Sequence, residues 1–300
     1  MSRPPGQRGN ALRSLRHGHP TAPIPRRARP REALHAGIDH ARAVPAEVPA
    51  AFVYDGSTYA VMMASPSDLE DFALGFSLTE GIVARPEEIT SLDIIEQRKG
   101  IELRMWLSPD RGRNLAERRR RMAGPTGCGL CGVESLDAAV PPCPRVTAAL
   151  TVTSLDITAG LAALPEAQVL HQQTRAVHGA AFWTRGRGLI AVAEDVGRHN
   201  ALDKLIGRLR REATPVHDGI VLLTSRVSVE MVHKAAVAGA PIVVAVSAPT
   251  ALALETADQA GITLIAVARA DGFEIFTHPH RIDGVAAPAS RRRAEVEHAA

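Results

Sequence analysis

Short apolar runs and helical segments alternate along the second half of the chain. The runs have the length of buried strands, and the helical segments end at Gly239 and Gly261. Strands that alternate with helices predict an α/β fold with a mostly parallel sheet that is covered on both faces. We expect strands at residues 220–224, 242–246 and 262–268, and helices at residues 229–238 and 252–260.

Two turns frame this alternating region. Residues 180–183 and 189–193 flank a glycine-rich turn and predict a hairpin, after which residues 198–210 carry a helical pattern. A second turn at Asp271-Gly272 leads into a last strand at residues 274–277. We therefore expect an α/β core over residues 146–283, followed by a tail over residues 284–300.

A smaller N-terminal α+β part is expected over residues 45–145. Apolar residues on both sides of Asp55-Gly56 predict a hairpin, and residues 92–107 predict strands that turn at Lys99-Gly100.

A helix is expected between these strands. Ser67 and Glu70 have the spacing of a capping box, and Gly81 is a stop signal. We expect this helix to be core structure without chemistry of its own, because it presents one apolar face made of Leu69, Phe72, Ala73 and Phe76.

The start of the chain differs in composition from the rest. Residues 1–31 contain eight arginines, six prolines and no acidic residue. The net charge of the whole chain is +3, so the remaining residues carry −5 and the basic character belongs to this segment. Such a composition cannot bury enough apolar surface to fold, and we expect a disordered basic extension over residues 1–44. A slightly acidic folded part does not support a nucleic-acid partner.

Composition excludes several classes of protein. No apolar run is long enough for a membrane-spanning helix, so no membrane partner is expected. Three cysteines do not make the disulfide framework of a small secreted protein, and they are compatible with a reducing compartment. Aromatic residues make up 3% of the chain, which is too few for a surface that stacks single-stranded nucleic acid.

The pair Cys128-Gly129-Leu130-Cys131 lies in a glycine-rich stretch that also contains Pro125. We expect a mobile loop, because this stretch cannot form a stable helix or a central strand. A reachable thiolate could attack a persulfide on a donor protein and present the outer sulfur to an acceptor. The arginines at residues 118–121 would favour the thiolate, and a second thiol could resolve or protect the persulfide.

Other interpretations of the cysteine pair stay open. A closed zinc site needs four ligands, so Cys143 and a distant histidine would have to join the pair. A thioredoxin-type redox pair follows a strand, which the arginine-rich stretch before Cys128 is not. A purely structural pair would be buried. Zinc deaminase chemistry is not favoured, because Gly179-Ala180 follows His178 where such enzymes need a glutamate.

Polar residues follow several of the expected strands. Residues 194–200 lie between a strand and a helix, and residues 224–228 and 246–250 follow the next two strands. Ligands of parallel α/β sheets bind beyond the carboxyl ends of strands, so we expect a polar crevice that includes Arg226 and is closed by residues 269–272. For residues 194–200, a capped helix start with solvated polar groups is the plainer alternative.

Several stretches together resemble the FdhD family, the sulfur carriers needed to make active formate dehydrogenase. The resemblance covers roughly residues 45–283 and includes the cysteine loop at residues 127–132. Its other stretches are residues 67–81, Glu194-Asp195-Val196-Gly197-Arg198-His199-Asn200-Ala201-Leu202-Asp203-Lys204, residues 224–234 and Phe276-Thr277-His278-Pro279.

The resemblance implies a cytoplasmic homodimer with a cytidine-deaminase-like α/β core. It implies a sulfurtransferase-type persulfide relay, in which sulfur passes from a cysteine desulfurase to bis-molybdopterin guanine dinucleotide, the molybdenum cofactor of formate dehydrogenase. By this match Cys128 bears the persulfide, Cys131 supports it, and no permanent metal is needed. The family's cofactor-binding stretch falls on Val267, Ala268, Arg269, Ala270, Asp271 and Gly272.

Two alternative functions remain. A non-catalytic chaperone of the molybdenum cofactor would use the polar crevice alone and would bind guanine nucleotides without either cysteine. A zinc-binding module would use the cysteine pair to hold a metal that resists mild chelation.

Overall fold

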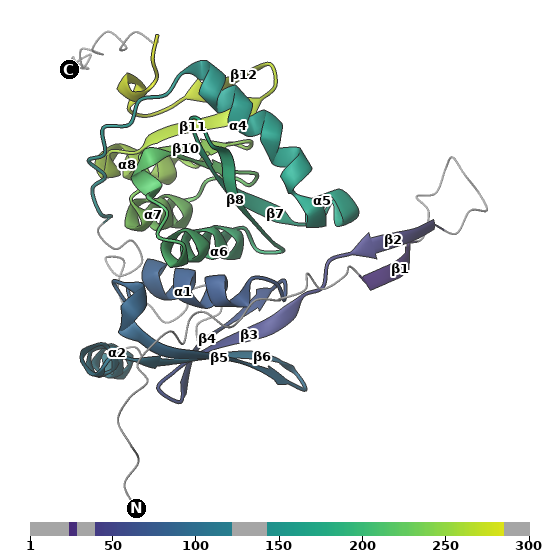
Figure 1. The fold of residues 1–300 in the computed structure, drawn as a ribbon, viewed down its shortest axis with the longest axis vertical. Coiled ribbons are helices and arrows are strands. Elements are labelled where there is room, and N and C mark those ends of the chain that lie inside the picture. The colour runs from purple at the N-terminus through teal and green to yellow at the C-terminus, as the bar shows by residue number, and fades with distance from the viewer. Residues whose placement is uncertain (1–23, 29–39, 122–142, 285–300) are drawn as a thin grey trace, which may run out of the picture.

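The structure is a computed structural model that describes residues 24–28, 40–121 and 143–284 (Figure 1). Those residues form a smaller unit and a larger unit that lie one above the other (Figure 1). Within the described residues, none of the helices has the length and apolar character needed to span a membrane.

The larger unit is built on a six-stranded sheet whose strands are β7 (His178–Thr184), β8 (Gly188–Asp195), β9 (Ile220–Leu223), β10 (Ile242–Ala245), β11 (Thr263–Arg269) and β12 (Gly272–Ile275). Their order across the sheet is β12-β11-β10-β9-β7-β8. β10 pairs in parallel with β9 and β11, and these strands are joined by the helices α7 (Val229–Ala238) and α8 (Ala251–Ala260).

The sheet is mixed, whereas the sequence predicted a mostly parallel one. β7 pairs antiparallel with β8 and β9, and β12 pairs antiparallel with β11. The chain turns back within a few residues between β7 and β8 and between β11 and β12, and so short a connection can only join antiparallel neighbours. The expected α/β class is confirmed, and the parallel part is limited to the strands linked by crossover helices.

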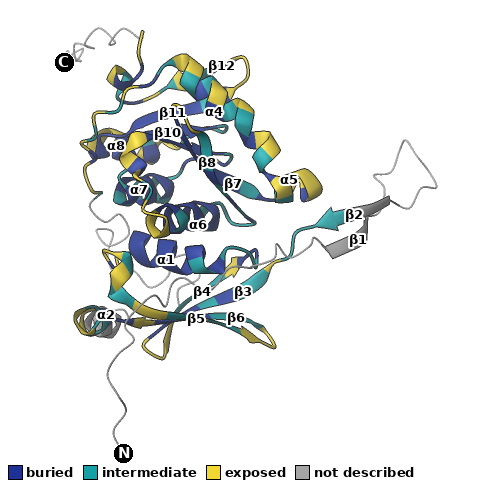
Figure 2. Ribbon diagram, viewed as in Figure 1, coloured by how far each residue is buried: buried dark blue, intermediate teal, exposed yellow. Residues whose placement is uncertain are grey.

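Helices cover both faces of this sheet (Figure 2). α4 (Ser154–Ala167), followed by α5 (Val169–Thr174), packs on one face, where Ile157 of α4 belongs to the same apolar cluster as Ile220 and Leu222. α6 (Arg198–Arg211), α7 and α8 pack on the other face, where Leu205 of α6 joins Val221 and Leu223. Successive β9 residues thus point to opposite cores, as a strand buried on both faces requires.

The smaller unit is a four-stranded sheet, in the order β4-β3-β6-β5, with one helix on its inner face. Both hairpins predicted from the turns at Asp55-Gly56 and Lys99-Gly100 are confirmed. The Phe52 ring stacks on the Phe76 ring with centroids 4.0 Å apart, so strand and helix share one core. The elements are β3 (Val48–Tyr54), β4 (Ser57–Ala64), α1 (Leu69–Thr79), β5 (Ile89–Gln97), β6 (Gly100–Leu107) and α2 (Pro109–Arg121).

The start of α1 differs from the predicted capping box. The N-cap residue is Asp68, in the left-handed conformation at φ 52°, and it makes no side-chain capping hydrogen bond. The Asp68 carboxylate instead accepts a hydrogen bond from the Arg208 guanidinium of α6 at 2.6 Å. A contact between the units therefore holds this helix start, so the capping-box prediction from Ser67 and Glu70 was wrong.

Part of the segment predicted to be disordered is paired. β1 (Ile24–Ala28) and β2 (His40–Val44) form a two-stranded antiparallel sheet, and β2 lies against α5 (Figure 1). Strand pairing is made by backbone groups, which a rule based on side-chain composition does not count.

The units meet where α1 crosses α6 (Figure 2). A Cβ atom on Gly75 would lie 1.8 Å from the carbonyl oxygen of Asp203, and one on Gly207 would lie 1.8 Å from that of Asp71. Each glycine thus lets the backbone of one helix approach the backbone of the other. This crossing fixes the position of α6, whose first residues belong to the candidate site.

Candidate functional site

Four strands of the larger sheet end at one edge. β9, β10 and β11 are parallel, and β8 runs the same way because β7 is antiparallel to both β8 and β9. Backbone hydrogen bonds join the loops, from the Thr250 amide to the Val227 carbonyl at 3.0 Å and from the Val267 amide to the Ser247 carbonyl at 3.3 Å. The structure therefore brings the predicted polar segments after β8, β9, β10 and β11 to the same edge, which we call the strand-end edge.

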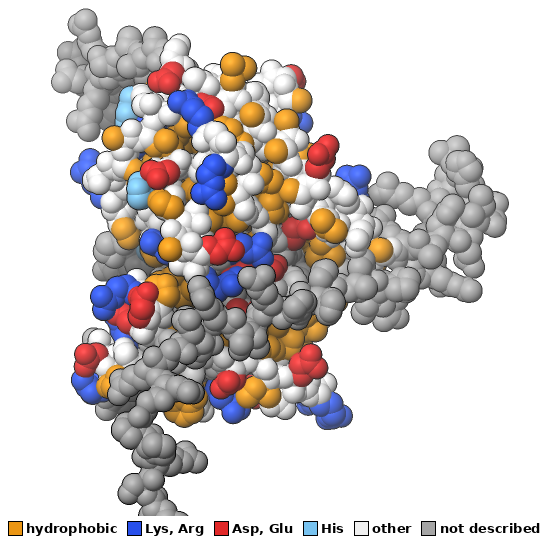
Figure 3. All heavy atoms as spheres, in the orientation of Figure 1, with side chains coloured by type: hydrophobic (Ala, Val, Ile, Leu, Met, Phe, Trp, Pro, Cys, Tyr) orange, Lys and Arg blue, Asp and Glu red, His pale blue; other side chains and the backbone are white. Residues whose placement is uncertain are grey.

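Two exposed arginines lie on the strand-end edge. Arg226 follows β9 and Arg269 is the last residue of β11. Neither guanidinium forms an ion pair with an acid in the part of the chain that the structure describes. Unpaired guanidinium groups are good partners for phosphate oxygens, so this edge can hold an anion. On the face shown in Figure 3, basic and acidic side chains also gather along the boundary between the units.

The hydroxyl groups expected at this edge have mostly structural partners. Thr224 Oγ1 accepts a hydrogen bond from the Gly179 amide at 2.8 Å, and Ser225 Oγ donates to the Arg226 carbonyl at 3.0 Å. Thr250 Oγ1 caps α8 by accepting from the Ala253 amide at 3.3 Å. Ser228, the N-cap residue of α7, differs from them because its Oγ is buried without a hydrogen-bond partner.

The stretch Val267–Gly272, expected to bind the cofactor, spans the β11–β12 turn. Val267 lies at φ 51°, inside an irregularity of the strand pairing between Ala266 and Arg269. A β-branched residue is strained in that conformation. Ala268 is 1% exposed and packs in the core, so its side chain cannot touch a ligand. The exposed residues of the stretch are Arg269, Ala270, Asp271 and Gly272.

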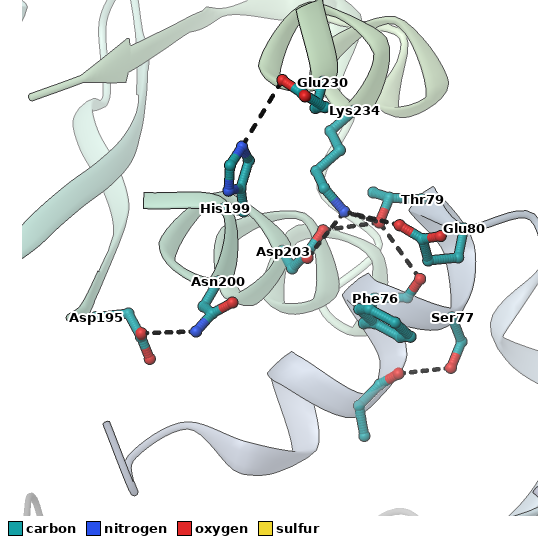
Figure 4. A network of polar contacts seen from close by, with 11 residues as sticks. Phe76, Ser77, Thr79, Glu80, Asp195, His199, Asn200, Asp203, Glu230 and Lys234 are labelled. Carbon is teal, nitrogen blue, oxygen red and sulfur yellow. Dashed lines mark hydrogen bonds and ion pairs between the residues drawn. The ribbon is translucent and has the colours of Figure 1, made fainter. Parts of the chain in front are cut away.

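A cluster of polar side chains lies at the first turns of α6 and α7 (Figure 4). His199 Nε2 and Glu230 Oε2 face each other at 4.0 Å, which is too long for a hydrogen bond. Four buried atoms of this cluster have no hydrogen-bond partner in the structure: Arg198 Nε, His199 Nε2, Ser228 Oγ and Glu230 Oε2. The His199 and Glu230 side chains are nevertheless 30% and 42% exposed, so water as well as a ligand can reach these groups.

The His199 imidazole is neutral at physiological pH. Its pKa is lowered to about 4, mainly by burial and in part by the nearby positive charges of Arg198 and Lys234, against the opposing effect of Glu230. A neutral imidazole offers one donor and one acceptor nitrogen, so His199 can either give or accept a hydrogen bond.

The acidic and amide side chains of residues 194–204 hold the two units together. The Asp195 carboxylate is 0% exposed and accepts hydrogen bonds from the Ser65 amide at 2.9 Å and the Asn200 side chain at 2.9 Å. Lys204 Nζ lies 2.6 Å from Asp195 and donates to the Ser65 carbonyl at 2.8 Å. The alternative of a helix start with solvated polar groups is therefore wrong for these residues, because they are buried against β4 and the turn that follows it.

A second buried ion pair lies deeper in the same boundary (Figure 4). Lys234 Nζ of α7 contacts Asp203 of α6 at 3.0 Å, and it also reaches Thr79 at 2.9 Å and Glu80 at 3.4 Å beside α1. Burial by itself lowers the pKa of Lys234, but the Asp203 and Glu80 carboxylates raise it above its ordinary value. α1 thus supplies a polar partner to the larger unit in addition to the apolar core face that the sequence predicted.

Cys128 and Cys131 lie outside the described residues, so the prediction that they belong to a mobile loop stays untested. Cys143 is described: it is half-buried, packs against the main core of the larger unit, and has a thiol pKa raised by burial. A raised pKa disfavours the thiolate that a metal site or a nucleophile needs. Among the described residues, no group of three or more His, Cys, Asp or Glu side chains is placed to hold a metal ion.

Sequence reasoning missed the role of α7 in this site. Glu230 faces His199, and Lys234 lies one turn further along α7 with its charge committed to Asp203. The spacing of four residues between Glu230 and Lys234 puts both on one helix face, which was a usable signal. Their partners come from α6 and α1, far away in the sequence, and no local pattern identifies them.

Comparisons with known proteins agree on one family. The model of the FdhD/NarQ family matches residues 45–283. A protein named sulfur carrier protein FdhD from Agrobacterium fabrum is 54% identical over 80% of this chain and 89% of its own length. A protein of the same name from Bordetella petrii is 47% identical over 79% of this chain and 85% of its own length.

A solved structure supports the fold. The crystal structure of a candidate formate dehydrogenase accessory protein from Desulfotalea psychrophila superposes with a TM-score of 0.66 and 25% sequence identity. The match covers 87% of this chain and 99% of that one.

Proposed function

The chain belongs to the FdhD/NarQ family, and from this we propose that it is a sulfur carrier that helps to make active formate dehydrogenase. The observation that carries the proposal is the 54% identity to a protein named sulfur carrier protein FdhD, over most of both chains. The cysteine pair lies within the matched residues 45–283, so the matched part contains thiols that a sulfur carrier can use.

In the proposed relay, Cys128 receives sulfur from a persulfide on a cysteine desulfurase. The Cys128 thiolate attacks the outer sulfur, a new S–S bond forms at Cys128, and the old S–S bond breaks to release the donor cysteine as a thiolate. This exchange needs no external oxidant or reductant. Cys131 is the supporting thiol, and its distance of three residues allows it to shield or resolve the persulfide.

The proposed recipient of the sulfur is bis-molybdopterin guanine dinucleotide, bound as a client of the strand-end edge. Its phosphate groups suit the unpaired guanidinium groups of Arg226 and Arg269, and the latter belongs to the stretch Val267–Gly272. The unpaired polar atoms at Arg198 and Glu230 lie at helix starts on this edge and leave hydrogen-bonding capacity for the rest of the cofactor.

The remaining expectations belong to the same proposal. Cysteine desulfurase is the expected donor and formate dehydrogenase the expected client enzyme. The protein is expected to act as a cytoplasmic homodimer with a core like that of cytidine deaminases and with no permanent metal.

Sulfur loading at Cys128 tests the proposal directly. The purified protein is incubated with a cysteine desulfurase and cysteine, digested with trypsin and analysed by mass spectrometry. We expect one added sulfur on the peptide of residues 122–145, which holds all three cysteines of the chain. Fragmentation of this peptide should assign the sulfur to Cys128 rather than to Cys143, and Cys143→Ala is the matched control.

Activation of formate dehydrogenase separates the relay from the chaperone. A Cys128→Ala protein that still activates formate dehydrogenase would refute the relay and favour a chaperone that only delivers the cofactor. Cys131→Ala should load sulfur at Cys128 but transfer it more slowly.

A further inference from the structure

The outer side of α4 is apolar and exposed. Leu155 is 79% exposed, which is the largest exposed fraction among the large apolar side chains that the structure describes. Ala159 and Ala162 are also exposed, and their spacing puts them on the same side of the helix as Leu155 (Figure 2). The opposite side packs on the sheet through Ile157 and Leu164. A helix that is apolar on both sides is normally covered on both sides, so we look for the cover of Leu155, Ala159 and Ala162, which we call the α4 stripe.

A single acid ends the α4 stripe. Glu166 follows Ala162 by four residues, so its exposed side chain lies on the same side of the helix. Its carboxylate forms no ion pair within the described residues, whereas Asp156, near the start of α4, pairs with Arg185. A negative charge in the last turn of a helix is unfavourable beside the helix dipole, so a cation is the expected partner of Glu166.

The chain leaves the described structure beside the start of α4. Val152 forms a parallel bridge with Ile282, and the Asp283 amide donates to the Val152 carbonyl at 2.8 Å. The two segments thus run side by side in the same direction, and α4 begins two residues after Val152, at Ser154. Residues that follow Gly284 are therefore tethered next to the α4 stripe, at an effective concentration on the order of millimolar. This tether favours them over a separate partner molecule.

The sequence after Gly284 matches the α4 stripe in order. Six uncharged residues precede three arginines, in the order Val285-Ala286-Ala287-Pro288-Ala289-Ser290-Arg291-Arg292-Arg293. Pro288 favours an extended stretch, because it disfavours the helical conformation of the residue before it.

The lengths of the two segments also agree. An extended chain advances about 3.3 Å per residue, so Arg291 can lie about 23 Å from Gly284. At 1.5 Å per residue, Glu166 lies about 18 Å from the start of α4. The first arginine can therefore reach Glu166 when the uncharged residues lie along the α4 stripe.

We propose that residues 285–291 dock in extended form along α4, with residues 285–289 on the α4 stripe and Arg291 paired with the Glu166 carboxylate. The contact joins two parts of one chain. It shields an apolar surface that would otherwise be open to other chains. The inference does not depend on the proposed function, because neither α4 nor residues 285–291 take part in the proposed relay.

Zero-length cross-linking of the full-length protein tests the ion pair. In Arg291→Lys, a carbodiimide couples the new amine to a carboxylate that touches it, and peptide mass spectrometry identifies the pair. We expect the cross-link from position 291 to Glu166 to be about five-fold more abundant than the cross-link to Glu255, an exposed acid of α8 that serves as the matched control. Equal abundance overturns the inference. If the Glu166 cross-link joins two chains, seen as a band of twice the mass on a denaturing gel, the segment docks on a second copy and the inference is also overturned.

Trypsin cleavage after residues 291–293 tests the α4 stripe. The protease cuts this segment only when it is undocked, and a charge on the stripe should release it. We therefore expect Leu155→Asp to raise the cleavage rate about five-fold, as for a segment that is docked about four-fifths of the time. Leu252→Asp is the matched control, because Leu252 is 43% exposed and is likewise the second residue of its helix. Equal rates in the two variants overturn the inference. The cross-link needs no change in α4, so it decides the matter if Leu155→Asp folds poorly.

Discussion

The crossing of α1 and α6 makes a sharp prediction about Gly75→Ala. The added Cβ atom would lie 1.8 Å from the Asp203 carbonyl oxygen and 2.9 Å from the Gly207 amide nitrogen. Both neighbours are backbone atoms of a helix, so no side-chain rotation can relieve the clash. The helices must move apart by about 1.6 Å to reach the 3.4 Å of ordinary contact.

The cost follows from that displacement. Overpacking of a core costs about 1–3 kcal/mol. The same movement stretches the buried hydrogen bonds of Thr79 with Asp203 and with Lys234 across the boundary, at about 1 kcal/mol each. Alanine returns about 1 kcal/mol because it favours helix more than glycine does. We therefore expect Gly75→Ala to lower the free energy of unfolding by about 3 kcal/mol.

Urea denaturation measures this loss in both units. The chain has two tryptophans, Trp106 in β6 of the smaller unit and Trp183 in β7 of the larger unit. Single-tryptophan variants therefore report on each unit separately, and both transitions should shift to lower urea.

Gly160→Ala in α4 is the matched control. Its Cβ would meet a Leu222 methyl group at 3.3 Å, which can yield, so we expect a change within about 1 kcal/mol. If Gly75→Ala were no less stable than Gly160→Ala, the close helix crossing would be refuted as the joint between the units.

Three more predictions concern single groups. The pKa of His199 is about 4 in the folded protein and about 6.5 when unfolded, so the unfolded chain takes up the proton first as the pH falls. Stability should therefore drop by roughly 1–2 kcal/mol between pH 7 and pH 5, and His199→Gln should remove that part of the slope in urea titrations at the two pH values. Lys204→Met leaves the Asp195 charge buried and unpaired, and it should cost about 3–5 kcal/mol by the same titration, with Lys204→Met/Asp195→Leu regaining part of the loss. Val267→Gly should raise the stability by about 1 kcal/mol in thermal unfolding, because glycine adopts φ 51° without strain; an unchanged or lower midpoint would contradict the strain.

The elements that follow from local signals could be predicted well. The helix expected at residues 229–238 is observed as Val229–Ala238, and it ends at Gly239, whose φ is 82°. The residue after this helix has a left-handed conformation, which glycine adopts without strain. The glycine therefore marks the end of the helix in the sequence itself. The hairpins could also be predicted from the sequence. A hairpin joins antiparallel strands, and the prediction of a mostly parallel sheet did not include these antiparallel pairs.

The contacts between the units could not be predicted. Asp68 appeared as part of a helix start, yet its carboxylate pairs with Arg208, whose position depends on the whole larger sheet. Likewise, the strand-end positions were correctly placed at one edge, but Thr224 and Ser225 turned out to have structural partners and Ser228 did not. Whether a polar side chain is open or engaged is decided by tertiary packing, which no spacing rule contains.

The buried ion pairs under α1 determine how this protein can move. Swinging the two units apart would expose to water four charged side chains that are now less than 8% exposed: Asp195, Lys204, Asp203 and Lys234. It would also break their contacts with Ser65, Thr79 and Glu80 of the smaller unit. Hinge motion at this boundary therefore has a high free-energy cost, and we expect the two sheets to move together. The sulfur donor and the sulfur recipient must then bind in turn to a framework of fixed shape. Any movement that carries sulfur between them has to come from segments attached to that framework.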